Sequence, residues 1–375
     1  MKTEKLLKVL LLSTVIILSS CKKDNPAPVA DNDGEDCTVV APATYEFAYD
    51  GTNTVAYDGQ AARLATAKSV YDVLNSNPTT STTTITRAEL DLIIDNTNSK
   101  LITKTAENSD NRAVVIDHLN SILDTYCANS AAYDLGTEAS AGTAGLYDGY
   151  QLDANGWEAD QQFAKMLIGS LCLEQVNYDY LTKMGEETDN IDRTYGDPAV
   201  YTKREHYYDE AFGYVYGLDN DDLDAEILNG LLLGKYLNKH DGIDGKSGID
   251  YRQRAYDAFK MGRQALVDNC TEELDRQISI INSSLSKVVA WHAQDYLSGA
   301  ASAIGTADFH HDVSEAWGFV YSLQFTKVNG VPLFSHSEVM TMISDLQSGP
   351  NGAWDLDAPT LNNMAAMINN AVVFD

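Results

Sequence analysis

The sequence predicts an all-α protein: a duplicated helical bundle with one short β-hairpin near its N-terminus. Three observations lead to this fold class. Apolar residues recur with the period of an α-helix through almost the whole chain after residue 60. Short loops separate these periodic segments, as in a bundle of helices. A segment of thirteen residues occurs twice, 105 residues apart, which indicates an internal repeat.

The hairpin is expected within residues 44–58, TYEFAYDGTNTVAYD. Aromatic and polar residues alternate there on both sides of an Asp-Gly pair, and such alternation is typical of a strand with one buried face. An Asp-Gly pair favours a tight turn between two antiparallel strands. A single hairpin is therefore expected before the first helix.

Helices are expected wherever apolar residues fall three or four positions apart. Thr86 and Glu89 form a capping-box pattern at the start of the second helix. The stretch 128–150 is rich in Gly, Ala, Ser and Thr without a clear period, and we expect it to be the longest loop. The expected helices lie at residues 59–75, 87–101, 112–127, 156–181, 206–218, 222–240, 250–269, 271–299, 311–323, 334–346 and 359–372.

Residues 1–20 have the pattern of a secretory signal. Three lysines precede an apolar run that is too short to span a membrane, and small residues follow it. Leu-Ser-Ser-Cys resembles the bacterial lipobox, which implies cleavage before Cys21 and a lipid on its sulfur; an ordinary signal with a chance cysteine is the alternative. Residues 21–40 would then be a flexible tether and residues 41–375 the folded domain. This places the protein in the cell envelope, lipid-anchored to the outer membrane.

The chain is strongly acidic, with a formal net charge of −29 from 26 basic and 55 acidic residues. Such a charge repels nucleic acid and attracts cations, so no nucleic-acid partner is expected. Four cysteines follow Cys21, and an oxidising compartment allows three pairings among them. Cys172 lies in an apolar helical stretch and is expected to be a buried free thiol.

The repeated segment is HYYDEAFGYVYGL at 206–218 and HDVSEAWGFVYSL at 311–323. Seven of the thirteen positions are identical, whereas about one would match by chance at typical residue usage. Residues four apart share one face of a helix, so each copy carries a stripe of one histidine, one glutamate and small residues. A glycine inside a helix costs about 1 kcal/mol relative to alanine, so the stripe predicts close approach of another helix. If a two-fold axis relates the copies, that helix is the other copy.

Under that arrangement four side chains converge: His206, Glu210, His311 and Glu315. Two interpretations remain open. In the first, these side chains hydrogen-bond to one another and fix the register of the bundle. In the second, they hold iron or another divalent metal, the ligand chemistry of carboxylate-bridged helical bundles. Asp209 and His310 flank the motif and could add ligands.

Other polar residues could support such a site from outside its set of ligands. The candidates are Glu158, Gln162, Lys165 and His292. The sequence has no His-Glu-x-x-His zinc motif, no serine nucleophile elbow and no complete phosphate-binding loop. The sequence therefore favours a protein that is not an enzyme.

Four segments together resemble the domain-of-unknown-function family 4856: YDGQAARL at 57–64, GWEADQQFAKMLIGSL at 156–171, HYYDEAFGY at 206–214 and HDVSEAWGFVYSL at 311–323. That family consists of Bacteroidota lipoproteins, and the resemblance spans the mature chain. The family in turn resembles imelysin-type proteins, which implies paired helical bundles, a His-x-x-Glu motif and a link to iron uptake. In this chain the residue three after His206 is Asp209, and the glutamate follows one position later.

These observations predict a lipid-anchored envelope protein that binds iron, another divalent cation or an iron-containing ligand. Two alternatives remain open. One is a metallopeptidase-like envelope protein. The other is a surface protein that binds a carbohydrate or a protein partner, for which the 21 tyrosines would provide stacking surfaces.

Overall fold

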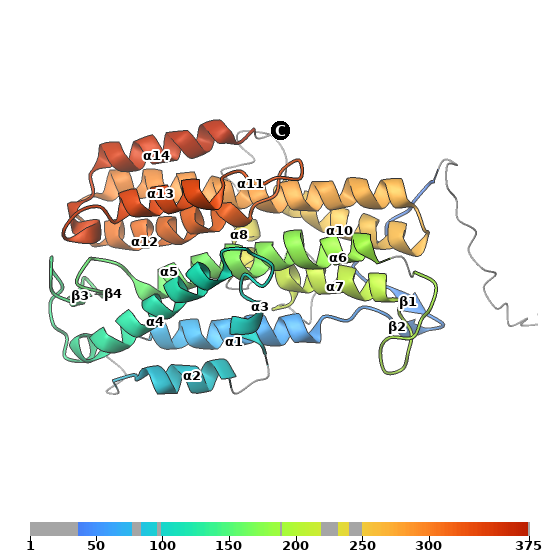
Figure 1. The fold of residues 1–375 in the computed structure, drawn as a ribbon, viewed down its shortest axis with the longest axis horizontal. Coiled ribbons are helices and arrows are strands. Elements are labelled where there is room, and N and C mark those ends of the chain that lie inside the picture. The colour runs from blue at the N-terminus through green and yellow to red at the C-terminus, as the bar shows by residue number, and fades with distance from the viewer. Residues whose placement is uncertain are drawn as a thin grey trace, which may run out of the picture. The chain divides into compact units, whose positions relative to one another are not determined.

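The computed structural model describes residues 37–76, 84–95, 99–187, 190–218, 232–239 and 250–373. Within these ranges the chain is mostly helical, as the apolar period predicts (Figure 1). The predicted all-α class with a short N-terminal hairpin is confirmed. The signal, Cys21 and most of the tether lie outside the described residues, as does most of the helix expected at 222–240.

The predicted hairpin consists of β1 (Ala48–Tyr49) and β2 (Thr52–Asn53), which pair antiparallel with Ala48 opposite Asn53. Asp50 and Gly51 form the turn, with φ angles of 49° and 76°. Two successive positive φ angles match the right-handed twist of the strands, which explains why an Asp-Gly pair occupies this turn.

A second hairpin lies where we expected only a loop. The helix before it, α4 (Arg112–Asp134), extends beyond residue 128, and β3 (Gly145–Tyr147) then pairs antiparallel with β4 (Tyr150–Leu152). Asp148 and Gly149 form its turn, again with positive φ angles, of 49° and 95°. The prediction of a long loop over 128–150 is therefore wrong, and the Asp-Gly signal used for the first hairpin was also present here.

The remaining elements agree with most of the expected ranges. Thr86 and Glu89 cap α2 as predicted, with the Thr86 amide donating to the Glu89 carboxylate at 2.8 Å. The helices are α1 (Asp58–Leu74), α2 (Arg87–Asp95), α3 (Leu101–Lys104), α4 (Arg112–Asp134), α5 (Ala159–Leu167), α6 (Leu181–Glu186), α7 (Lys203–Tyr216), α8 (Leu233–Asn238), α10 (Tyr251–Val267), α11 (Thr271–Ala303), α12 (Ala307–Ser322), α13 (His336–Leu346) and α14 (Ala358–Ala371). Wider π-helical turns, η1 (Ile168–Leu173) and η2 (Gln175–Tyr180), connect α5 to α6, and the short 3₁₀ turns are η4 (Leu323–Phe325) and η5 (Gly352–Asp355).

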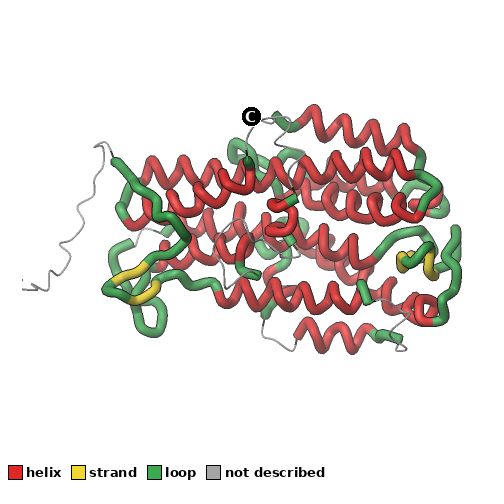
Figure 2. Tube along the Cα trace, turned by 180° about the vertical axis from the view of Figure 1, so that it is seen from behind, coloured by secondary structure: helices red, strands yellow, loops and turns green. Residues whose placement is uncertain are grey.

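The long helix α11 organises the C-terminal part of the fold, because α10, α12 and α14 all pack along it (Figures 1 and 2). The α12 helix also packs against α5, and this pair joins the C-terminal helices to earlier segments. Buried apolar side chains form one cluster that extends from Tyr45 to Val372. No helix within the described ranges is both long enough and apolar enough to cross a membrane.

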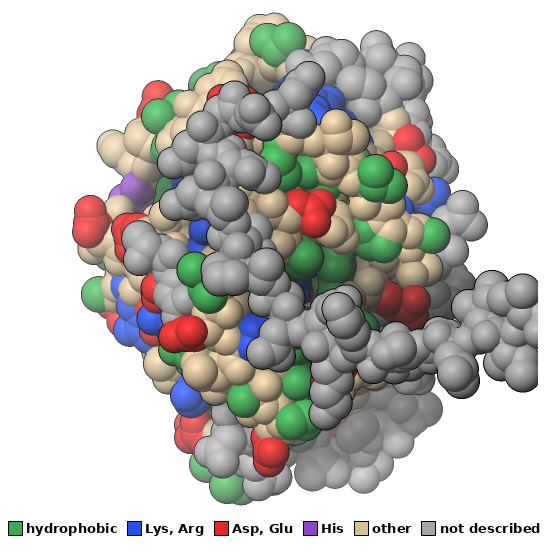
Figure 3. Space-filling model, turned by 90° about the vertical axis from the view of Figure 1, so that its right-hand side faces the viewer, with side chains coloured by type: hydrophobic (Ala, Val, Ile, Leu, Met, Phe, Trp, Pro, Cys, Tyr) green, Lys and Arg blue, Asp and Glu red, His purple; other side chains and the backbone are tan. Residues whose placement is uncertain are grey.

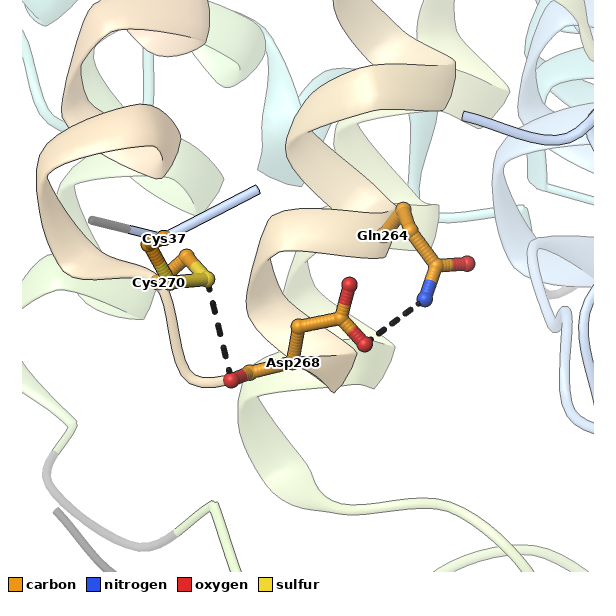
Figure 4. Close-up of a disulfide and its surroundings, with 4 residues drawn as sticks. All are labelled: Cys37, Gln264, Asp268 and Cys270. Carbon is orange, nitrogen blue, oxygen red and sulfur yellow. Dashed lines mark hydrogen bonds between the residues drawn. A yellow bond between two sulfur atoms is a disulfide. The ribbon is translucent and has the colours of Figure 1, made fainter. Parts of the chain in front are cut away.

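A disulfide joins Cys37, the first described residue, to Cys270 at the start of α11 (Figure 4). Nearby, at the end of α10, Gln264 donates a hydrogen bond to Asp268 at 2.9 Å. Cys172 is buried and free, as expected. The disulfide therefore attaches the chain that leads into the fold to the body of the helices.

Hydrophobic side chains at the described surface are scattered. On the face shown in Figure 3 they are interspersed with acidic and basic side chains. Val40 and Ile191 are among the most exposed, at 75% and 72%. Isolated exposed hydrophobic residues are ordinary in soluble proteins and do not define a docking surface.

Candidate functional site

The two copies of the repeated segment form α7 and α12, and both helices begin at a threonine. The Thr202 hydroxyl accepts the Glu205 amide in a full capping box, and the Thr306 hydroxyl accepts the Phe309 amide. Each threonine satisfies an amide that has no partner inside the helix. His206 follows its N-cap threonine by four residues and His311 follows its own by five, so both histidines lie in the first two turns of their helices.

The small residues of both stripes lie against another helix, as predicted. A Cβ atom placed on Gly213 would be 2.5 Å from the Tyr57 Cβ, next to α1, and one placed on Gly318 would collide with the Lys165 Cβ on α5. A Cβ on Gly169 would likewise be 2.5 Å from Ser322. The neighbouring helix is thus an earlier segment in each case and not the other copy.

In the first copy, His206 is paired with Glu210, with 3.6 Å between its Nε2 and the nearer carboxylate oxygen. Gln60 of α1 donates to the other Glu210 oxygen at 2.9 Å. The imidazole stacks on Tyr201, with ring centroids 5.1 Å apart. Its Nδ1 is buried and has no hydrogen-bond partner among the described residues.

Asp209 does not join His206. Its carboxylate accepts hydrogen bonds from Arg263 at 2.9 Å and from the Tyr45 hydroxyl at 2.7 Å. Both Asp209 and Arg263 are fully buried, and burial raises the pKa of Asp209 although Arg263 opposes this. Arg263 also pairs with Glu205 at 3.2 Å. A buried guanidinium requires such partners, so Asp209 is occupied as a counter-ion.

In the second copy, His311 lies between two carboxylates. Its Nδ1 donates to Glu158 at 2.7 Å, and its Nε2 is 3.9 Å from Glu315. Burial opposes the charged imidazole, but the hydrogen bond and charge of Glu158 outweigh it and raise the pKa of His311. Tyr150 stacks on the imidazole, with centroids 5.1 Å apart, as Tyr201 does in the first copy.

Glu315 has a further and closer cation. The Lys165 ammonium lies 2.5 Å from Glu315 Oε1, and these side chains are only 1% and 5% exposed. Tyr236 also donates to Oε1, at 3.0 Å. Burial alone would raise the pKa of Glu315, but Lys165 and His311 lower it to about 2. The second oxygen, Oε2, is buried and has no hydrogen-bond partner among the described residues.

Two more carboxylates beside this group indicate an excess of negative charge. Burial and the neighbouring Glu158 raise the pKa of Asp160 to about 7. Burial also raises the pKa of Asp312 to about 6, with Glu315 contributing and His311 opposing. We refer to Glu158, Asp160, Lys165, His311 and Glu315 as the His311 cluster. It holds three carboxylates against one lysine and one histidine, so added positive charge would stabilise it.

The other predicted site residues lie elsewhere. His310 donates to the Gly156 carbonyl at 2.8 Å and packs on Trp354, and burial lowers its pKa. His292 bonds the Tyr236 carbonyl at 3.0 Å. Gln162 lines a cavity beside the cluster.

His206 and His311 have no partner in common. Within the described part of the chain, no three His, Cys, Asp or Glu side chains form a ready-made metal site. Sequence reasoning missed Asp160 and Gln161, although Glu158, Gln161 and Lys165 have the three- and four-residue spacing of one helix face. Gln161 accepts a hydrogen bond from Lys165 there.

The fold and the polar groups around His206 and His311 define an all-α class of protein in which buried and partly buried His, Glu and Lys side chains join neighbouring helices. Within this class, the chain belongs to the family described as Domain of unknown function (DUF4856), whose model matches residues 42–375. No curated protein and no solved structure matches the chain.

Proposed function

We propose that this protein is a lipid-anchored binding protein of the cell envelope, without catalytic activity, that takes part in the acquisition of iron or another divalent metal. The anchor rests on the signal-like residues 1–20 and the lipobox-like sequence ending at Cys21. The metal ion is the cargo, and the His311 cluster is its site.

The observation that carries this proposal is the donor set around one imidazole. His311 has a carboxylate near each ring nitrogen, at 2.7 Å and 3.9 Å, and the buried Glu315 Oε2 lacks a partner among the described residues. Imidazole and carboxylate are suitable ligands for ferrous iron, zinc and manganese. His311, Glu158 and Glu315 would hold the ion, and the cluster's excess of carboxylates would favour it.

Access and competition set the conditions for binding. The His311 side chain is 30% exposed, so it can be reached from solvent and can turn from Glu158 toward an ion. Lys165 already neutralises part of the charge, so the ion competes with a protein cation. Protons compete as well, because coordination requires a neutral imidazole and the pKa of His311 is raised.

The test measures ferrous and zinc binding by calorimetry at pH 7.5 and pH 5. We expect one ion per chain at pH 7.5, with affinity reduced at least tenfold, about 1.4 kcal/mol, by His311→Gln or Glu158→Gln and by the lower pH. His336→Gln is the matched control. His336 forms a 2.6 Å hydrogen bond with Gln324 and is not part of the His311 cluster.

A His206→Gln variant shows whether the first copy contributes, and it should bind like wild type. Equal weak binding by wild type and all four variants would instead mean that the acidic surface collects cations without a specific site. In that case the proposal is wrong and the His311 cluster serves only to hold α5 against α12.

A further inference from the structure

A cavity of about 250 Å³ lies beside the His311 cluster, on an adjoining face of the α5–α12 pair. It is walled by α4, the segment after β4, α5, α12 and the segment after α13. This volume is just below the range of about 300–1,000 Å³ that is typical of pockets for drug-sized ligands. The cavity therefore suits one small ring.

Aromatic and polar side chains share the lining. Tyr133, Trp157 and Trp317 are each less than 5% exposed and supply flat apolar surfaces. Asp153 and Gln162 supply a carboxylate and an amide. This pairing of rings with planar hydrogen-bonding groups suits a ligand that has both apolar C–H faces and polar edges.

One polar group of the lining lacks a partner within the described ranges. The Trp317 Nε1 is buried and forms no hydrogen bond with any described residue, although an indole N–H normally finds an acceptor when it is buried. Gln162 is 7% exposed and lines the same cavity, so its side-chain amide is available to a ligand there. A buried donor without a partner costs about 1–3 kcal/mol, so a ligand oxygen would stabilise this wall.

The position of Asp153 is fixed by its own turn. One carboxylate oxygen accepts the Asn155 amide at 2.8 Å and the Trp157 amide at 3.0 Å. The Asn155 carbonyl in turn accepts the Ala353 amide at 2.8 Å, which ties this turn to the segment after α13. The wall is thus formed before any ligand arrives, which lowers the entropy cost of binding.

The charge of the lining excludes several ligand classes. Among the described residues around the cavity there is no Lys or Arg, and burial lowers the pKa of His118, which also lines it. Phosphate, sulfate and carboxylate groups would therefore find no permanent counter-ion. A purely apolar ligand would leave the Trp317 N–H unsatisfied and would cover the Gln162 amide without offering it a hydrogen bond. The lining therefore favours a small neutral molecule with several hydroxyl groups, since a hydroxyl both donates and accepts.

We propose that this cavity binds one neutral sugar ring of the pyranose type, either free or at the end of a glycan. Ring hydroxyls accept from Trp317 Nε1 and the Gln162 amide and donate to Asp153, while the C–H face of the sugar packs on the aromatic side chains. The site shares no residue with the His311 cluster, so it is independent of the proposed cation binding.

The experiment titrates the full mature chain, in the presence of a chelator, with the methyl glycosides of glucose, galactose, mannose and N-acetylglucosamine. Tryptophan fluorescence and calorimetry report binding, because Trp157 and Trp317 line the cavity. At least one glycoside should saturate a single site. The matching disaccharides distinguish the two sources, since a site for glycan ends binds the disaccharide at least as well as the monosaccharide.

Trp317→Phe keeps a large ring but removes the N–H, and Gln162→Leu removes the amide. Each should weaken binding at least tenfold while circular dichroism shows an intact fold. Trp354→Phe is the matched control, because the Trp354 Nε1 is also buried without a partner among the described residues but does not line the cavity. Failure of every glycoside to saturate wild type, or wild-type affinity in both cavity variants, would overturn the proposal.

Discussion

Replacement of Lys165 by methionine tests whether the His311 cluster contributes to stability as a buried ion pair. The substitution keeps the length and apolar stem of the side chain but removes the ammonium that lies 2.5 Å from Glu315. Glu315 is then left with Tyr236, Tyr296 and the more distant His311 as partners. A buried carboxylate without its main counter-ion is strongly destabilising.

Two arguments give the size of the expected loss in the free energy of unfolding. Removal of one partner from a buried pair costs about 3–5 kcal/mol. The pKa of Glu315 is lowered from 4.5 to about 2, and a shift of that size corresponds to about 3 kcal/mol, to which both Lys165 and His311 contribute. We therefore expect Lys165→Met to lower the free energy of unfolding by about 3 kcal/mol at pH 7.5.

The way in which this loss of stability depends on pH follows from the lowered pKa of Glu315. The folded pKa of Glu315 lies below its unfolded value, so its stabilisation is present above about pH 4.5 and is lost as the pH falls toward 2. In Lys165→Met this stabilisation is largely absent at every pH. The difference between variant and wild type should therefore shrink as the pH falls below 4.5.

Urea unfolding monitored by circular dichroism at pH 7.5 and pH 4 measures this difference. Lys68→Met is the matched control, because Lys68 pairs with Asp72 at 2.7 Å while both side chains are more than half exposed. That exposed pair should contribute less than about 1 kcal/mol. The double variant Lys165→Met/Glu315→Gln should recover part of the loss. If Lys165→Met costs no more than Lys68→Met, the buried ion pair does not stabilise the fold as argued.

Two further predictions concern the same helix pair. Gly318→Ala should destabilise the protein by about 1–3 kcal/mol through overpacking against Lys165. The control Gly185→Ala in α6 has no atom within 4 Å of its new Cβ and should stabilise the protein by about 0.5–1 kcal/mol. Equal melting temperatures for these two variants would contradict the close approach of α5 and α12. Asp160 has a folded pKa of about 7 against an ordinary 3.8, so its contribution to stability is present at acidic pH and is lost as the pH rises through 7. Asp160→Asn should therefore raise the free energy of unfolding at pH 8 and make it less dependent on pH between about pH 4 and 7. Asp345→Asn, on the exposed face of α13, controls for the loss of one charge. An unchanged slope of unfolding free energy against pH in Asp160→Asn would refute this account of Asp160.

The sequence was sufficient for those features that depend on short-range patterns. The apolar period locates the helices because a helix in a bundle must bury one face wherever it lies. The Thr86–Glu89 cap forms as predicted because its partners are three residues apart. The pairing of His206 with Glu210 was foreseeable for the same reason, since residues four apart on a helix are neighbours.

Some local features were overlooked although their signals were present. The β3–β4 hairpin contains an Asp-Gly turn like that of the first hairpin. On the helix that became α5, Glu158 and Lys165 were predicted as supporting residues, whereas Gln161, which has the spacing of the same face, was missed. The stretch 128–150 is rich in small and polar residues, but its Asp-Gly pair is the local signal that indicates a turn.

Only the tertiary structure decided which helix lies against each repeated segment. Both glycine stripes require a close neighbour, but any helix with suitable residues meets that requirement, and the neighbours are α1 and α5. The same choice assigns Lys165 to Glu315 and Arg263 to Asp209, through contacts 150 and 54 residues apart in the chain. A sequence specifies that a buried carboxylate needs a partner, because desolvation is costly whatever the fold. The identity of that partner depends on the packing of distant segments, which residue spacing along the chain does not encode.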